Sequence, residues 1–277
     1  MTTTRTPATR LDVRSTDGTP IAVWVEGDGP PLVLVHGSIA DHTTFEPFVA
    51  ALRDGTTTFS LDRRGFGASG DAPSYTIERD FEDVAAVVEA VADRVGGPVT
   101  LWGHSYGANA AMGGAALSPR VSHLVLYEPS LGLPYPPGSI DAIEAALARG
   151  DREAAIVGVL VDILELSDDE VAAMRATPLW PVRLAAAPTI PRECRAEEGW
   201  VYRPGQFAGI EAPTLLLAGS DSVPVVVEAT RRAAAAIPGA RVRVLDGHAH
   251  LAHKADPAMM AAIVREFTAP GGRAAGG

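Results

Sequence analysis

The segment that most constrains this 277-residue chain is Gly103-His104-Ser105-Tyr106-Gly107. It follows the apolar run 99–102 and precedes a run of mostly small residues, 108–114. An apolar strand that enters a helix through Gly-x-Ser-x-Gly makes a turn so sharp that the serine takes a strained backbone conformation. A side chain at either glycine would collide with a neighbouring strand or helix. The pattern therefore predicts that Ser105 is held out at the tip of its strand.

Apolar runs alternate with helical patterns along most of the chain. A β-hairpin is expected at 11–15 and 21–26. Apolar runs predict buried strands at 31–36, 99–102, 121–127 and 212–218, and further strands are expected at 57–61 and 242–245. Helical spacing predicts helices at 43–52, 77–92, 226–237 and 257–267. This order predicts an α/β fold, a doubly wound and mostly parallel sheet. Its active site should lie where the loops at the carboxyl ends of the strands converge.

Between residues 133 and 208 the rhythm changes. A proline-rich stretch, 134–137, interrupts the sheet, and no strand pattern occurs in the rest of this region. Helical patterns follow at 139–148, 152–164 and 168–175. We therefore expect a core formed by residues 11–132 and 209–268, a helical insertion at 133–208, and flexible tails at 1–10 and 269–277.

From about residue 11 to residue 267, the chain resembles the α/β-hydrolase family. The resemblance rests on the Ser105 turn and on further motifs in the family's order. These motifs are His36-Gly37, the glycine-rich loop 62–70, Glu128-Pro129, Gly219-Ser220-Asp221, and His250 followed by His253, Asp256 and Pro257. The resemblance implies a serine hydrolase whose helical insertion forms a cap over the active site. The glycine-rich loop is interpreted as a structural turn without a chemical role.

A serine hydroxyl is a poor nucleophile at neutral pH. Ser105 therefore needs a base within hydrogen-bonding distance and an acid that orients that base. The spacing of His250, His253 and Asp256 resembles the family's segment after the last strand, whereas His248 does not fit it. His250 is thus the expected base, and His253 is expected to support the site or to lie on the surface.

Two carboxylates compete for the role of the orienting acid. In the commoner family arrangement the acid stands three residues after the glycine at position 219, where this chain has Ser222, and Asp221 lies one position earlier. In another arrangement, found in haloalkane dehalogenases and zearalenone lactonases, the acid follows the strand after the elbow helix, which is the position of Glu128. A glutamate that ends an apolar strand is costly unless its charge is used or paired. Glu128 is therefore preferred, with Asp221 as the alternative.

A developing oxyanion needs hydrogen-bond donors. The backbone N–H groups of Tyr106 and Ser38 are expected to form the oxyanion hole, one at the start of the elbow helix and the other after the His-Gly pair at 36–37. In the insertion, Trp180 and Trp200 are candidate substrate-binding residues. Packing within the insertion is the commoner use of such aromatic side chains.

Composition limits the expected partners. A net charge of −11 argues against nucleic acid and anionic membranes, which attract basic surfaces. Cys194 is the only cysteine, so an intrachain disulfide is impossible and a reducing cytoplasm is expected. Residues 1–10 do not resemble a secretory signal, and no apolar run reaches about 18 residues. The abundance of alanine and the single lysine, Lys254, are typical of high-GC bacterial genes. Neither a metal nor another cofactor is expected, since the C-terminal histidines lack zinc-ligand spacing.

The predicted activity is hydrolysis of an ester, lactone or thioester of a small, hydrophobic substrate through an acyl-enzyme. Two alternatives stay open: a C–C bond hydrolase or perhydrolase that uses the same residues, and a ligand receptor of low turnover on the same fold. The sequence indicates neither the substrate nor the oligomeric state.

Overall fold

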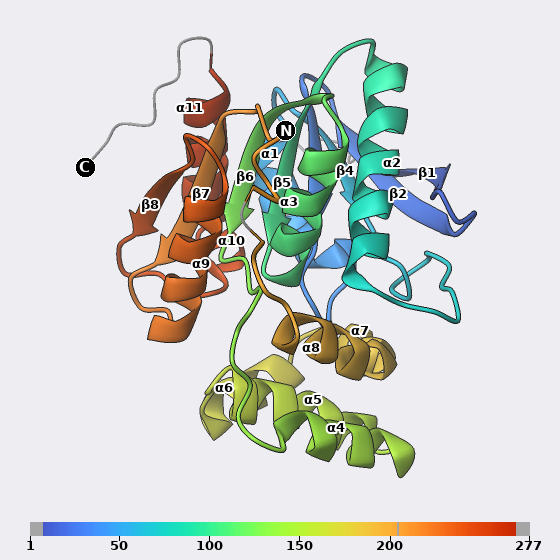
Figure 1. The fold of residues 1–277 in the computed structure, drawn as a ribbon, viewed down its shortest axis with the longest axis vertical. Coiled ribbons are helices and arrows are strands. Elements are labelled where there is room, and N and C mark those ends of the chain that lie inside the picture. The colour runs from blue at the N-terminus through green and yellow to red at the C-terminus, as the bar shows by residue number, and fades with distance from the viewer. Residues whose placement is uncertain (1–7, 204, 270–277) are drawn as a thin grey trace, which may run out of the picture.

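A central eight-stranded sheet organises the computed structural model, which describes residues 8–203 and 205–269. Its strand order is β1-β2-β4-β3-β5-β6-β7-β8 (Figure 1). The strands are Thr9–Arg14 (β1), Pro20–Gly27 (β2), Pro31–Val35 (β3), Thr57–Leu61 (β4), Val99–His104 (β5), Val121–Tyr127 (β6), Thr214–Gly219 (β7) and Arg241–Leu245 (β8). Pairing is antiparallel from β1 to β2 and from β2 to β4, and parallel from there to β8. The predicted α/β fold with a mostly parallel sheet is confirmed.

Helices cover both faces of the sheet. On one face lie α2 (Ile77–Val95), α3 (Tyr106–Leu117) and α9 (Pro224–Ala236). On the other lie α1 (Glu46–Leu52), α10 (Ala252–Ala255) and α11 (Pro257–Thr268), with a 3₁₀ turn, His42–Phe45, leading into α1. Since helices cover both of its faces, β5 is buried along its whole length, which explains why its sequence is mostly apolar.

The residues between β6 and β7 form a separate group of helices, hereafter the helical segment (139–198). It lies beyond one end of the sheet (Figure 1). It consists of α4 (Ser139–Ala148), α5 (Arg152–Gly158), a π-helical turn (Val159–Ile163), α6 (Asp168–Arg175), α7 (Trp180–Ala186), a 3₁₀ turn (Ala187–Thr189) and α8 (Ile190–Glu198). These helices share an apolar cluster of their own. Buried Arg63, from the loop after β4, joins α8 to the core through an ion pair with Glu193.

Two helices of this segment, α7 and α8, were not predicted. Each carries a proline within its first two residues, Pro181 in α7 and Pro191 in α8. Proline is compatible with the first turn of a helix, because the N–H groups there have no intrahelical acceptor. Pro181 and Pro191 therefore mark helix starts rather than breaks.

The predicted N-terminal tail, residues 1–10, extends two residues into the first strand. Thr9 and Arg10 belong to β1, where they pair with Val25 and Trp24 of β2. The remainder of the predicted tails, residues 1–7 and 270–277, lies outside the described residues, as does residue 204. Among the helices that the structure describes, none combines the length and apolarity that a membrane span requires.

Candidate active site

Ser105 lies at the junction of β5 and α3, with φ 55° and ψ −127°. The glycines on either side make this turn sterically possible. A Cβ at Gly107 would lie 2.3 Å from the carbonyl oxygen of His36, and one at Gly103 would lie 2.5 Å from that of Gly107. Both contacts involve backbone atoms that cannot move aside. The turn thus has the strand-turn-helix geometry that the motif predicts.

Backbone strain is concentrated around a single cavity. Four non-glycine residues among the described ones have positive φ: Ile39, Ser105, Glu128 and Glu165, at 51°, 55°, 48° and 56°. All four line a cavity of about 290 Å³. Such conformations are uncommon, especially for a β-branched isoleucine, and persist only where the surrounding structure imposes them. Their shared location marks this cavity as the functional site.

Glu128 and His250 meet at the cavity. Nδ1–H of His250 donates to Oε2 of Glu128 at 2.5 Å. The other carboxylate oxygen of Glu128 accepts from the Gly219 N–H at 2.7 Å and from the Ser222 hydroxyl at 2.6 Å. Burial alone raises the pKa of Glu128, but the bond to His250 and these two donors outweigh it and lower the pKa below its ordinary value. The buried carboxylate is therefore ionised and holds the Nδ1 proton of His250.

Two side chains at the ends of β5 and β6 fix the backbone around His250. His104 donates from Nε2 to the His250 carbonyl at 2.8 Å. The Tyr127 hydroxyl donates to the Ala249 carbonyl and accepts from the Ala252 N–H at 3.2 Å. His104 is buried, which lowers its pKa well below the ordinary value and keeps the ring neutral. His253 is also buried, 4.5 Å from the His104 ring. These residues hold the loop that carries His250.

The loop after β3 forms the opposite wall of the cavity. Nδ1 of buried His36 donates to the Gly37 carbonyl at 2.7 Å, and Nε2 accepts from the Arg63 N–H at 3.0 Å. Burial and the Arg63 charge lower the pKa of His36 to about 3, so both contacts belong to the neutral ring. A Cβ at Gly37 would lie 3.0 Å from the Cβ of Ser105, so the loop passes directly beside the serine. The next residue, Ser38, lines the cavity.

Comparison with known proteins places this arrangement in a family. A sequence profile of the alpha/beta hydrolase family matches residues 32–263. The chain belongs to the α/β-hydrolase family. It is 34% identical to an α/β-hydrolase of known structure from Sphaerobacter thermophilus, with a TM-score of 0.80 over 93% of this chain and 99% of that one. It also resembles the structure of an esterase from Rhodococcus, with 25% identity and a TM-score of 0.73 over 93% and 98% of the two chains.

A third protein that this chain resembles has a named substrate. The 2-(acetamidomethylene)succinate hydrolase of Mesorhizobium japonicum is 25% identical over 258 residues, which cover 87% of this chain and 89% of that protein. Together the comparisons establish the superfamily and the fold of this hydrolase.

Several residues predicted for the site lie away from its centre in this α/β-hydrolase. Asp221 is exposed at the cavity rim, where its carboxylate accepts from the Ser220 hydroxyl and its N–H donates to the His248 carbonyl. Trp180 is buried in the apolar cluster of the helical segment. The Trp200 ring packs edge-on against Phe81, with ring centroids 5.9 Å apart. Among the described residues, neither tryptophan lines the cavity.

Sequence reasoning missed a buried glutamate of the helical segment. Glu197 lines the cavity and accepts hydrogen bonds from the Asn109 amide at 2.8 Å and from the hydroxyls of Ser130 and Tyr135. Burial raises the pKa of Glu197 to about 7, although these three donors oppose the rise. Its spacing in α8, four residues after Glu193, places both acids on the face that packs on the core, which is the only signal in the sequence.

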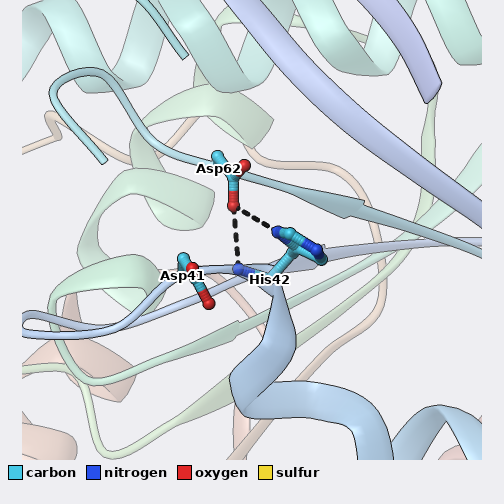
Figure 2. A group of neighbouring side chains, drawn as sticks. All are labelled: Asp41, His42 and Asp62. Atoms are coloured by element: carbon cyan, nitrogen blue, oxygen red, sulfur yellow. Dashed lines mark hydrogen bonds and ion pairs between the residues drawn. The ribbon is translucent and has the colours of Figure 1, made fainter. Parts of the chain in front are cut away.

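One cluster has the composition of a metal site. Asp41, His42 and Asp62 lie close together beside the loop after β4 (Figure 2). Asp62 accepts bonds from the backbone and ring nitrogens of His42, both at 2.8 Å, and from Trp24 and Ala68 at 3.1 and 2.9 Å. Burial raises the pKa of Asp62, but these donors prevail and lower it to about 2. Both oxygens of Asp62 thus accept hydrogen bonds from the surrounding chain, which ties the segment 41–42 and Trp24 to the loop after β4.

Proposed function

We propose that this protein is a serine hydrolase that cleaves an ester, lactone or thioester of a small molecule. The observation that carries the proposal is the hydrogen bond from His250 Nδ1 to buried Glu128, formed in the cavity that strained Ser105 also lines. In the neutral ring, a proton held on Nδ1 by Glu128 leaves Nε2 of His250 to accept the hydroxyl proton of Ser105. Glu128, rather than Asp221, orients the histidine.

The reaction has two halves. The Ser105 oxygen attacks the substrate carbonyl while His250 Nε2 takes its proton, and Glu128 stabilises the resulting imidazolium. His250 then gives the proton to the leaving alcohol or thiol, which leaves an acyl-enzyme. A water molecule, deprotonated by His250, attacks the acyl-enzyme and releases the acid. The proton returns to Ser105, so that no cofactor is consumed.

Two backbone N–H groups stabilise the charge that develops on the substrate oxygen. Tyr106 is the first residue of α3, so its N–H has no intrahelical acceptor and lies at the positive end of the helix dipole. Ser38 supplies the second N–H from the loop that passes beside Ser105. Each such donor is worth about 3 kcal/mol in the transition state.

The helical segment acts as the cap of this hydrolase. It contributes apolar side chains, those of Val159, Leu160, Ile163 and Leu164, to the cavity that Ser105 and His250 also line. A cavity of about 290 Å³ with such walls suits a small acyl group. Substrate specificity therefore depends on the residues that the cap contributes to the cavity, rather than on the fold itself.

A fluorophosphonate probe, which reacts with activated serines, tests the proposal directly. Wild-type protein should be labelled and should hydrolyse p-nitrophenyl acetate and butyrate, whereas Ser105→Ala should lose labelling and about 10⁶-fold in kcat. Ser38→Ala is the matched control, since alanine keeps the backbone N–H; it should retain labelling and kcat within several-fold. Absence of labelling in folded wild-type protein, or undiminished turnover in Ser105→Ala, would contradict the proposal.

A further inference from the structure

Two basic side chains line the cavity from different parts of the fold. Arg183 comes from α7 of the helical segment, and Lys254 comes from α10, four residues after His250. Arg183 is only 7% exposed, and Lys254 is half-buried. Lys254 is also the only lysine in the sequence. A largely apolar cavity thus carries two cations on its wall.

Arg183 is the exception among the buried arginines that the structure describes. Arg63 forms ion pairs with Glu193 and Asp80, and Arg64 does so with Asp83 and Asp17. Arg183, by contrast, makes only a 3.4 Å contact from Nη1 to the Leu179 carbonyl of its own helical turn, and its buried Nε has no partner.

An unpaired buried cation is costly, and proteins retain one mainly where a ligand completes the pairing. Burial lowers the pKa of Arg183, and no anion among the described residues counters this. The missing partner of Arg183 is therefore expected to come from outside the chain.

The charges around Lys254 define what that partner must be. Burial and the charge of Arg183 lower the pKa of Lys254 to about 8, while Asp41 opposes the change, so these three groups interact. The neighbouring His104 and His253 are neutral, since burial lowers the pKa of both well below the ordinary value. Arg183 and Lys254 both line the cavity, whereas Asp41 does not, so the two cations favour an anionic group in a bound ligand.

The cavity's own carboxylates do not serve as this partner. Glu128 and Glu197 are held by the donors described above, and Asp221 accepts from Ser220. Glu165 and Glu170 are exposed residues of the cavity lining, and the carboxylate of Glu170 is engaged by Ser167 in the capping box of α6.

We propose that Arg183 and Lys254 form a subsite that binds a carboxylate group of the substrate, so that this hydrolase acts on esters or related acyl compounds that carry a free carboxylate. The guanidinium fork of Arg183 suits the two oxygens of a carboxylate, and Lys254 adds a point charge. The apolar side chains of the cap enclose the carbon chain between the carboxylate and the scissile bond. This inference rests on the proposed function and adds the substrate class to it.

Matched esters test the substrate class. The probes are the monomethyl and dimethyl esters of succinic, glutaric, adipic and pimelic acid, with acid release followed in a pH-stat. In wild-type protein at least one monomethyl ester should exceed its dimethyl counterpart in kcat/KM by at least about ten-fold, as expected for charge-assisted hydrogen bonds. Arg183→Gln and Lys254→Gln should each remove most of this preference by lowering kcat/KM for the monomethyl ester. Arg152→Gln, which removes an exposed charge from the same helical segment, should leave the preference unchanged.

Binding is measured separately on Ser105→Ala, so that it does not depend on turnover. Calorimetry should detect the preferred monomethyl ester but not its dimethyl counterpart, and Arg183→Gln in the same background should abolish the signal. Acetylation of Lys254 by an N-hydroxysuccinimide ester, followed by peptide mass spectrometry, should be slowed by the monomethyl ester. Because Lys254 is the only lysine, the N-terminal amine is the internal reference.

The outcomes separate the two proposals. If monomethyl esters bind to Ser105→Ala and protect Lys254 while wild-type protein hydrolyses no ester, the subsite stands and the proposed hydrolysis is wrong. If wild-type protein hydrolyses both ester series equally and Lys254 is not protected, the subsite is wrong and the hydrolase stands. A stability measurement adds a third readout: Arg183→Leu should raise the melting temperature, because it removes an unpaired buried charge. A lowered melting temperature would assign Arg183 a structural role and overturn the subsite.

Discussion

Replacing Glu128 by glutamine removes one negative charge and nearly preserves the side-chain shape. The Gly219 N–H and the Ser222 hydroxyl both donate to Oε1 of Glu128, so they hold the amide oxygen of the variant in that place. The amide nitrogen then faces Nδ1 of His250 and donates to it. Nδ1 must become the acceptor, which moves the ring proton to Nε2. The nitrogen that should take the Ser105 proton is then already protonated.

The size of the effect follows from two contributions. The attraction between a carboxylate and the imidazolium that forms during catalysis is worth about 4 kcal/mol at 4 Å and an effective dielectric constant of 20. The unfavourable tautomer of His250 adds to this loss. The comparable change in another serine hydrolase lowers kcat about 10⁴-fold, which corresponds to about 5.5 kcal/mol. We expect the same order of loss in Glu128→Gln.

The assay is kcat with p-nitrophenyl butyrate, measured on variants shown by circular dichroism to be folded. Asp221→Asn is the control, because Asp221 is exposed and its carboxylate contacts Ser220 rather than His250; its kcat should change less than about three-fold. A Glu128→Gln variant that keeps more than about a tenth of wild-type kcat would refute the assignment of Glu128 as the orienting acid. So would a loss of about a hundred-fold or more in Asp221→Asn.

Three further predictions concern other parts of the molecule. Gly107→Ala should destabilise the protein by about 3 kcal/mol or more in urea unfolding, because the added Cβ meets backbone atoms at 2.3 and 2.4 Å, whereas Gly97→Ala meets nothing within 4 Å and should change little. The free energy of unfolding of Glu197→Gln, measured relative to that of wild-type protein in the same assay, should rise by up to about 3 kcal/mol between about pH 5 and about pH 8. The folded-state pKa of about 7 lies above the ordinary value of 4.5, so wild-type protein loses stability as pH rises between the two. KM for a monomethyl ester should rise above about pH 8 as Lys254 loses its proton, and this rise should be absent in Lys254→Gln.

Each of these has a clear contrary result. Equal stability of the Gly107→Ala and Gly97→Ala variants would mean that the turn after Ser105 can accommodate a Cβ, contrary to the contacts in the structure. If the difference in stability between Glu197→Gln and wild-type protein does not vary with pH, the pKa of Glu197 in the folded protein is not raised. A parallel rise of KM for the dimethyl ester would trace the pH effect to a group other than Lys254.

The sequence predicted the sheet well because its strands are strongly apolar and clearly bounded. The strands 57–61 and 121–127 and the helix 168–175 were predicted with the bounds that the structure shows. Both strands are largely buried, and the apolar residues of 121–127, together with the β-branched and aromatic residues of 57–61, are typical of buried strands. The helix 168–175 has a capping box at Ser167 and Glu170, which marks its start. Local signals suffice where a segment's own pattern decides its structure.

The residues that line the cavity were predicted less well, because contacts between distant parts of the sequence decide which side chains reach it. An aromatic residue such as Trp180 or Trp200 can pack in a core or contact a ligand, and nothing local distinguishes the two uses. Arg183 looks like one surface arginine among many in an arginine-rich chain, and only the fold shows that it is buried without an acid. Lys254 was noticed for its rarity, yet its neighbour Arg183 is 71 positions away in the sequence.

The contrast between the cavity and the rest of the core supports a functional origin for its costs. Elsewhere the buried arginines are paired, as Arg64 is with Asp83. At the cavity, Ile39, Ser105 and Glu128 adopt strained backbone conformations, and Arg183 is buried without an acidic partner among the described residues. Each feature costs stability, and natural sequences tolerate such conflicts mainly where function requires them. The strained backbone positions the serine and the glutamate, whereas Arg183 has no acidic partner among the residues that the structure describes. We therefore expect its partner to be the carboxylate of the proposed substrate.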